Sequence, residues 1–274
     1  MDNVNDFFAT LSSFLWGWPM IVLLLGTHVF LTIRLRFPQR KLFTAIRLSV
    51  QRDKSQKGDV SQFGALATAL AATIGTGNII GDATAVALGG PGAVFWCWLT
   101  GVFGISTKYS EALLAIKYRV KSERGTMQGG PMYTLERGLG WRWMGFLFAL
   151  FTAIAAFGIG CTVQANAIST IMHASYGIST EVSGVVLMLL AAAVIVGGVR
   201  SISKVCSMLV PLMALLYVVG CIYILCGNSD YVMPALKLIV SSAFSPEAAG
   251  GGFAGGSVIM AARYGIARGL FSNE

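Results

Sequence analysis

The sequence has few charged residues for its length. Charged side chains make up 12% of the 274 residues, about half of the share in an average soluble domain. Hydrophobic residues make up 55%, and the mean hydropathy is +0.70. A disordered chain has the opposite composition, so disorder is excluded. The apolar residues also stand in long uninterrupted runs, and we therefore expect lipid to surround most of this protein.

Residue types that build metal sites, disulfide frameworks and hydrolase sites are scarce. The five cysteines show no CxxC spacing and lie inside apolar runs, which predicts small buried hydrophobic residues. The two histidines, His28 and His173, have no metal-ligand spacing, and the GxSxG pattern of a serine hydrolase is absent. The N-terminus carries Asp2 and Asp6 where a secretory signal would carry Lys or Arg, so no cleaved targeting segment is predicted. We expect a protein that is not an enzyme.

Six segments are long and apolar enough to cross a bilayer, which takes about 20 residues of helix. None of them alternates apolar and polar residues with period two, so helices are favoured over a β-barrel. The sequence therefore predicts an all-α integral membrane protein with one transmembrane domain. The predicted spans cover residues 14–33, 63–88, 92–116, 143–170, 182–199 and 205–226.

The positive charges are concentrated beside these spans. A net charge of +8 is compatible with a nucleic-acid partner, but 17 of the 20 Lys and Arg lie within residues 34–62, 108–142 and 200–204, which flank apolar runs. We therefore expect membrane lipid, and no nucleic acid, as a partner. Short loops rich in Lys and Arg stay in the cytoplasm, so the N-terminus is predicted to lie outside.

The second predicted span contains two glycines in its middle, Gly75 and Gly77. Each glycine costs about 1 kcal/mol relative to alanine in a helix interior, and in hydrocarbon every freed backbone group must find another partner. One interpretation is that the helix is interrupted near Thr76, where bare amides suit a carboxylate and bare carbonyls suit Na⁺. The alternative is that the glycines only permit close packing against another helix.

Three polar side chains are candidates for such a site. Asn78 and Asp82 are one turn apart on one face of the second half-helix, and an acid inside a membrane is a functional candidate by default. The alternative for Asp82 is that it lies near the outer end of the span and meets water. Gln164, in the fourth predicted span, either bonds a neighbouring helix or faces a cavity.

Four long motifs stand along the chain: GTGNIIGDATAVALGGPGAVFW, KYSEALLAIKYR, GGPMY and RYGIARGLFSNE. They resemble the motifs of the alanine or glycine:cation symporter family, and the resemblance runs the whole length of the chain. It implies a protein of a bacterial or archaeal cell (inner) membrane that moves alanine or glycine inward. Na⁺, or H⁺, would be the coupling ion, with no further cofactor.

The resemblance also implies a leucine-transporter-like fold, with two inverted five-helix repeats around a site at the middle of the membrane. Residues 14–33 would be an extra N-terminal helix, and residues 63–226 the first repeat. Residues 227–256, which contain two prolines and a glycine run, are expected to form an outer loop with short helical pieces. Residues 257–274 would begin the second repeat.

By the same resemblance, the substrate site surrounds the break in the second span. Thr76 and Gly77 would offer their amides to the substrate carboxylate. The side chains of Thr73 and Asn78 would lie beside the substrate, and Gln164 falls where the family's helix faces the pocket.

The sodium site is expected to be incomplete in this chain. The carbonyls of Ala71 and Ile74 would supply half of it, and Asp82 remains a further candidate without an assigned role. In the family, the second wall of the site follows the motif that ends here at Glu274, so we expect the chain to need a second repeat. The alternative function is a truncated, non-transporting membrane scaffold or a channel-like protein.

Overall fold

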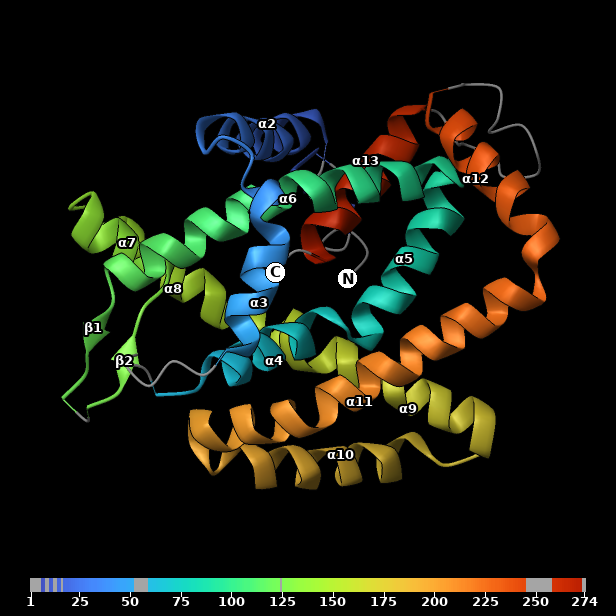
Figure 1. Cartoon of the computed structure of the whole chain (residues 1–274). Coiled ribbons are helices and arrows are strands. Elements are labelled where there is room, and N and C mark those ends of the chain that lie inside the picture. The colour runs from blue at the N-terminus through green and yellow to red at the C-terminus, as the bar shows by residue number, and fades with distance from the viewer. Residues whose placement is uncertain are drawn as a thin grey trace. The chain divides into compact units, whose positions relative to one another are not determined.

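The computed structural model describes residues 6–7, 10–11, 14–15, 17–51, 59–123, 125–244 and 258–272. These residues are almost entirely helical, as Figure 1 shows, and the prediction of an all-α membrane protein is confirmed. One small antiparallel hairpin, β1 (Val120–Lys121) with β2 (Met127–Gln128), accompanies the helices. The helices before it are α2 (Trp18–Arg34), η1 (Pro38–Lys41), α3 (Leu42–Val50), α4 (Gln62–Thr73), α5 (Thr76–Gly89) and α6 (Gly92–Lys117). Those after it are α7 (Pro131–Gly138), α8 (Arg142–Ala155), the π-helix η2 (Ala156–Thr162), α9 (Val163–Tyr176), α10 (Thr180–Ile195), α11 (Gly198–Gly227), α12 (Ser229–Phe244) and α13 (Val258–Ser272).

Three helical segments of the described chain are long and apolar enough to cross a membrane: Gln62–Gly89, Arg142–Tyr176 and Gly198–Gly227. A fourth candidate arises if α2 and the η1–α3 segment are counted as one broken span. Three of the six predicted spans are therefore matched by length and composition. Of the others, α2 and α10 are short, at 17 and 16 residues. Helix α6 has 26 residues, but its glycines, hydroxyl groups and charges lower its hydropathy.

Large apolar side chains cover the outside of the helices. Leu215, Leu216 and Ile222 of α11 are 61%, 64% and 54% exposed. Such a surface is unfavourable in water and is expected in lipid. All five cysteines are free, but Cys161 and Cys226 are exposed. The prediction that the cysteines are buried is therefore wrong for these two, because an apolar run in a membrane protein faces lipid as readily as the protein interior.

The described helices group into two compact units. One unit is formed within residues 1–41, 78–109 and 219–274, and the other within residues 42–77 and 110–218. One of the boundaries falls in the first turn of α5. The interrupted second span therefore contributes α4 to one unit and most of α5 to the other.

In the first of these units, buried polar groups attach α2 to α6. His28 Nδ1 lies 2.6 Å from Thr107 Oγ1, and Thr32 Oγ1 lies 2.8 Å from Ser106 Oγ. Gln39 Nε2 also donates to Ser106 Oγ at 3.0 Å. His28 is 5% exposed and Thr32 is 1% exposed, so these hydrogen bonds form in a medium of low dielectric constant, where they are strong. His28 is thus a packed residue of α2.

In the same unit, α13 lies directly against α6 because glycines remove the side chains between the two backbones (Figure 1). A Cβ on Gly265 would lie 2.8 Å from Trp96 Cβ. A Cβ on Gly269 would lie 2.8 Å from Thr100 Cβ and 3.1 Å from the Cys97 carbonyl oxygen. The GxxxG spacing of these two glycines therefore sets how α13 faces α6.

The predicted outer loop contains a longer helix than expected. Helix α12 has 16 residues and continues through Pro234, although a proline inside a helix removes one backbone hydrogen bond. Its last turn packs on α6, where Trp96 Nε1 donates to the Ala243 carbonyl at 3.4 Å and the Phe95 and Phe244 ring centroids are 5.0 Å apart. Tertiary packing explains why this segment is helical. The glycine run that was predicted to break the loop lies outside the described residues.

In the second unit, close packing on α11 holds α4. Ser61 caps α4 by accepting a hydrogen bond from the Gly64 amide at 3.0 Å. Gly64 is buried, and a Cβ there would overlap Ser203 Oγ and lie 3.6 Å from Ser207 Oγ. A glycine facing serines is the close approach that membrane helices commonly use.

Candidate functional site

The second span is interrupted where the sequence places its glycines. Helix α4 ends at Thr73 and α5 begins at Thr76, and between them Ile74 has φ −89° and ψ 67°, outside the helical range. The Ile74 amide still donates to the Leu70 carbonyl at 2.8 Å, so the helical ladder stops at this residue. A helix end leaves its last four carbonyls and its first four amides without partners in the same helix. The predicted break is confirmed, and it is two residues long.

Most of the residues predicted to form the site flank this break. Ala71 lies in the last turn of α4, Ile74 directly follows that helix, and Thr76 and Gly77 are the first two residues of α5. Thr73 closes α4, and its Oγ1 donates to the Ala69 carbonyl at 3.0 Å. The structure therefore places backbone carbonyls on one side of the break and amides on the other, while their roles stay predictions.

Gln164 also lies at the break. A Cβ placed on Gly75 would be 3.7 Å from Gln164 Oε1 and 3.8 Å from its Nε2. These are ordinary van der Waals distances, so the amide group of Gln164 stands against the interrupted backbone. The structure thus brings together two predicted residues that are far apart in the sequence. A side chain larger than a methyl group at position 75 would have to displace Gln164.

A π-helix ends two residues before Gln164. Within the predicted span over residues 143–170, η2 separates α8 from α9, an irregularity that was not predicted from the sequence. Within η2, Thr162 Oγ1 donates to the Gly158 carbonyl. Such π-helical turns occur often at functional sites because they change the helical register locally. The glycines at 158 and 160 were the available signal for this irregularity.

On α5, Asn78 and Asp82 share one face, as predicted, and an arginine of α13 joins them. Arg268 Nη2 donates to Asn78 Oδ1 at 2.5 Å, and its Nε lies 3.2 Å from Asp82 Oδ1. The Arg268 side chain is 16% exposed and that of Asp82 is 56% exposed. Sequence reasoning missed Arg268. The signal was a charged residue in an apolar helix, which in a membrane needs a partner.

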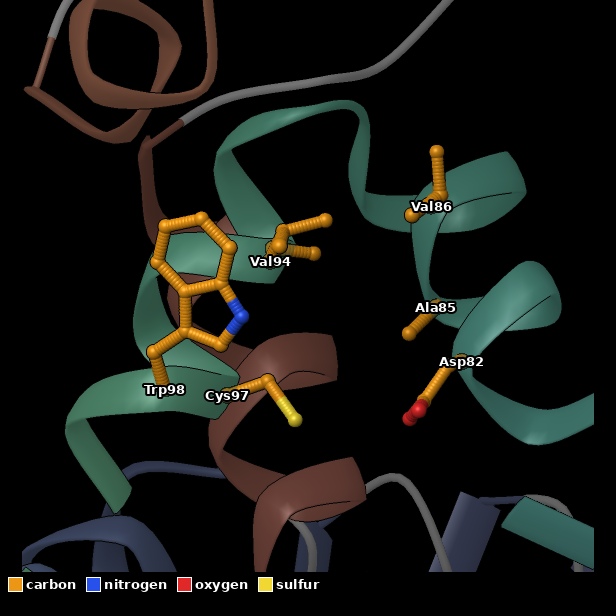
Figure 2. A pocket seen from close by; sticks show the side chains of 7 residues that line it. Asp82, Ala85, Val86, Val94, Cys97 and Trp98 are labelled. Atoms are coloured by element: carbon orange, nitrogen blue, oxygen red, sulfur yellow. The ribbon is translucent and has the colours of Figure 1, made fainter. Parts of the chain in front are cut away.

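A cavity of about 120 Å³ lies between α5 and α6 on the Asp82 side. Figure 2 shows the Asp82 carboxylate and Cys97 Sγ directed into the same space, with Trp98 on the α6 wall. Apart from Asp82 the walls are largely apolar. Asp82 therefore borders a cavity while it pairs with Arg268. The seven lining residues are Asp82, Ala85, Val86, Ala93, Val94, Cys97 and Trp98.

Comparison with known proteins gives matches along the whole chain. The sequence pattern of the sodium:alanine symporter family matches residues 1–274. Over 274 residues the chain is 50% identical to an uncharacterized transporter of Haemophilus influenzae, an alignment that covers 99% of this chain and 60% of that protein. Over 272 residues it is 49% identical to the sodium/alanine symporter AgcS of Methanococcus maripaludis, covering 97% of this chain and 59% of AgcS.

A more distant relative is named for another substrate. The probable sodium/glutamine symporter GlnT of Bacillus subtilis is 37% identical over 262 residues, covering 95% of this chain and 54% of GlnT. The chain thus spans somewhat more than half of the length of the relatives it matches. The family pattern over the full chain, the apolar helices and the interrupted second span agree with one another, and they identify this multi-pass membrane protein as a member of the sodium:alanine symporter family.

Proposed function

We propose that this chain forms half of the binding site of a sodium-coupled symporter for small neutral amino acids, with alanine as the first substrate to test. The observation that carries the proposal is the two-residue break between α4 and α5, with Gln164 beside it. A zwitterion and a cation need opposite partial charges within a few ångströms, and the two ends of a broken helix supply both. The name of AgcS, a sodium/alanine symporter, supports the choice of ligands.

In this proposal the substrate carboxylate binds at the start of α5. The amides of Thr76 and Gly77 point out of the first turn, where the positive end of the helix dipole favours an anion. Thr73 and Asn78 flank these amides, and Gln164 contributes a side-chain amide. Alanine and glycine both fit this set of polar groups. GlnT is named as a probable symporter of glutamine, whose side chain is longer than that of alanine.

Sodium binds at the end of α4 in the same proposal. The carbonyls of Ala71 and Ile74 supply oxygen ligands, and further ligands come from a second helical repeat in a leucine-transporter-like arrangement. Helix α2 is then the extra helix, α4 to α11 the first repeat and α13 the opening of the second. The N-terminus lies outside, and the basic loops face the cytoplasm.

The test is Na⁺-driven uptake of radiolabelled alanine into proteoliposomes that carry the protein together with the second helical repeat. Uptake is expected to saturate with alanine and to fall when choline replaces Na⁺; a pH gradient in the absence of Na⁺ tests H⁺ as the coupling ion. Gly77→Leu adds a bulky side chain at one of the two proposed carboxylate-binding amides and is expected to abolish uptake. Gly184→Leu is the matched control, because a Cβ on Gly184 of α10 meets nothing within 4 Å. Uptake that survives Gly77→Leu would reject the site, and non-saturating flux would indicate a pore.

A further inference from the structure

The end of α2 carries four positive charges within eight residues. Arg34 is the last residue of α2, Arg36 lies in the turn that follows, and Arg40 and Lys41 close η1. We call residues 34–41 the α2–η1 corner. All four side chains are exposed, and none of them has an ion-pair partner among the residues that the structure describes. A group of exposed cations without counter-charges attracts anions.

The backbone of this corner has an unfavourable conformation. Arg36 has φ 57° and Phe37 has φ 59°, and in the described parts of the chain they are the two non-glycine residues with positive φ. Glycine is the usual residue directly after a helix in this conformation, because an L side chain is strained there. A bulky residue such as Phe37 is a clear outlier. Strain of this kind points to a use for the two side chains that a glycine could not supply.

Hydrogen bonds hold the strained turn in place. The Phe37 amide donates to the Thr32 carbonyl at 2.9 Å, so the turn provides a partner for a carbonyl at the end of α2. Gln39 Nε2 donates to the Val102 carbonyl and to Ser106 Oγ, both at 3.0 Å, and these acceptors belong to α6. The α2–η1 corner is therefore attached to two helices, and its charges stand on a fixed backbone.

An exposed apolar stripe leads along α2 to these charges. Leu23, Phe30 and Ile33 are each 63% exposed, and the spacing of Phe30 and Arg34 places them on one face of the helix. A Cβ on Gly26 would meet nothing within 4 Å, so the surface is open there as well. Inorganic phosphate has no apolar part to match such a stripe. A phospholipid does, because its acyl chains begin close to its phosphate.

Phe37 lies where the apolar stripe meets the charges. Its side chain is 45% exposed, and the Arg40 guanidinium carbon lies 5.4 Å from the centroid of its ring, a cation–π contact. Helix α2 has 17 residues, which is about 25 Å of helix. The hydrocarbon core of a bilayer is about 30 Å thick, so the end of a helix of this length that crosses the bilayer lies close to the level of the lipid headgroups.

We propose that the α2–η1 corner binds the headgroup of an anionic phospholipid, whose acyl chains lie along the exposed stripe of α2. The guanidinium groups of Arg34 and Arg36 and the ammonium group of Lys41 donate hydrogen bonds to the phosphate oxygens. Phe37 lies at the boundary between the headgroup and the acyl chains. The inference goes beyond the proposed function and does not depend on it, because none of these residues belongs to the break in the second span.

Two simpler explanations of the charges predict something else. A basic residue in the last turn of a helix interacts favourably with the helix dipole, which accounts for Arg34 but not for Arg36, Arg40 and Lys41, since these three follow the helix. Basic loops that stay on one side of a membrane need only their charge and no strained backbone. Under either explanation, Arg36→Gly removes strain and leaves the affinity for an individual lipid unchanged.

The test measures the binding of phosphatidylglycerol to the purified protein in detergent by native mass spectrometry, with zwitterionic phosphatidylcholine for comparison. Phosphatidylglycerol is expected to bind more tightly. Arg36→Gly is expected to weaken its binding about 5-fold, the loss expected when one Lys or Arg leaves an anionic membrane surface. The same variant should unfold at the same temperature as the wild type or above it, since glycine relieves the strain. Lys41→Gln keeps the strained turn and should weaken binding by a similar factor.

The matched control is Lys121→Gln in the β1–β2 hairpin. Lys121 is exposed, but its neighbours Val120 and Met127 are not, so this variant removes one charge at a place without an exposed apolar stripe. Its affinity for phosphatidylglycerol is expected to equal that of the wild type. Equal affinity of the wild type for the two lipids, or equal effects of Arg36→Gly and Lys121→Gln, would overturn the inference. Displacement of the lipid by excess inorganic phosphate would also overturn it, because the corner would then recognise a free anion.

Discussion

The two halves of the interrupted span are held by different chemistry. Helix α4 is held by close packing, in which Gly64 meets Ser203 of α11. Helix α5 is held by a charged side chain, because Arg268 bridges Asn78 and Asp82. Small residues at a helix interface hold a helix by close contact between the two surfaces. A charged side chain in a membrane instead needs a polar or oppositely charged partner beside it. The half that carries the proposed sodium carbonyls is thus fixed by shape, and the half that carries the proposed substrate amides is fixed by charge.

The largest expected effect comes from disturbing the packed half. Gly64→Leu inserts a side chain into the space occupied by Ser203 Oγ, and overpacking of this kind costs about 1–3 kcal/mol. We expect a clear loss of thermal stability in detergent, measured with a thiol-reactive dye. Gly184→Leu, at an open position, is expected to be neutral or slightly stabilising. Equal stability of the two variants would contradict the assignment of α4 as a packed helix.

The charged half should respond to the loss of its counter-charge. Asp82→Leu removes the carboxylate that lies 3.2 Å from Nε of Arg268, a change that costs several kcal/mol in a fully buried pair. Because Asp82 is 56% exposed, we expect only about 1–2 kcal/mol. Asp82→Asn keeps an acceptor and should cost less. The thermal unfolding of both variants at low and high salt measures the difference, and identical behaviour of the two would show that charge is not the cause.

Substitutions of Gly75, at the junction between the halves, should distinguish the effect of side-chain size from the effect of losing the backbone freedom of glycine. Gly75→Ala places a methyl group at 3.7 Å from Gln164 Oε1, so its stability should change by about 1 kcal/mol or less. Gly75→Leu has to displace Gln164 and is expected to reduce alanine uptake strongly at similar stability. Uptake and thermal unfolding of the same preparations provide the comparison. Equal uptake by the two variants would show that Gln164 does not contribute to the substrate site.

The smallest effect is expected inside α4, where polar side chains bond to their own helix. Thr68 Oγ1 donates to the Gly64 carbonyl at 2.7 Å, and that carbonyl is already within the helical ladder. Thr68→Val should change the free energy of unfolding by about 0.5 kcal/mol or less. A larger destabilisation in thermal unfolding would mean that hydroxyl groups, in addition to shape, hold this half of the span.

The sequence was sufficient for the features that are local. Gly75 and Gly77 predict the break because two glycines weaken a helix wherever it lies, and the four-residue spacing of Asn78 and Asp82 places them on one face of any helix. The burial of Cys161 was predicted wrongly, since an apolar residue in a membrane protein can face either lipid or the protein interior. The π-helix before Gln164 was missed because glycines permit such a turn without requiring it.

The sequence alone determined that this chain is a multi-pass membrane protein of the sodium:alanine symporter family, and that its second span contains a weak point. These conclusions depend on composition, length and motifs, which are properties of consecutive residues. Only the tertiary structure decided that Gln164 stands against Gly75. It also decided that Arg268 contacts both Asp82 and Asn78, which lie 186 and 190 residues before it in the chain. Contacts of this kind depend on how closely glycines allow two helices to approach. The sequence does not state which helix occupies the space beside a glycine.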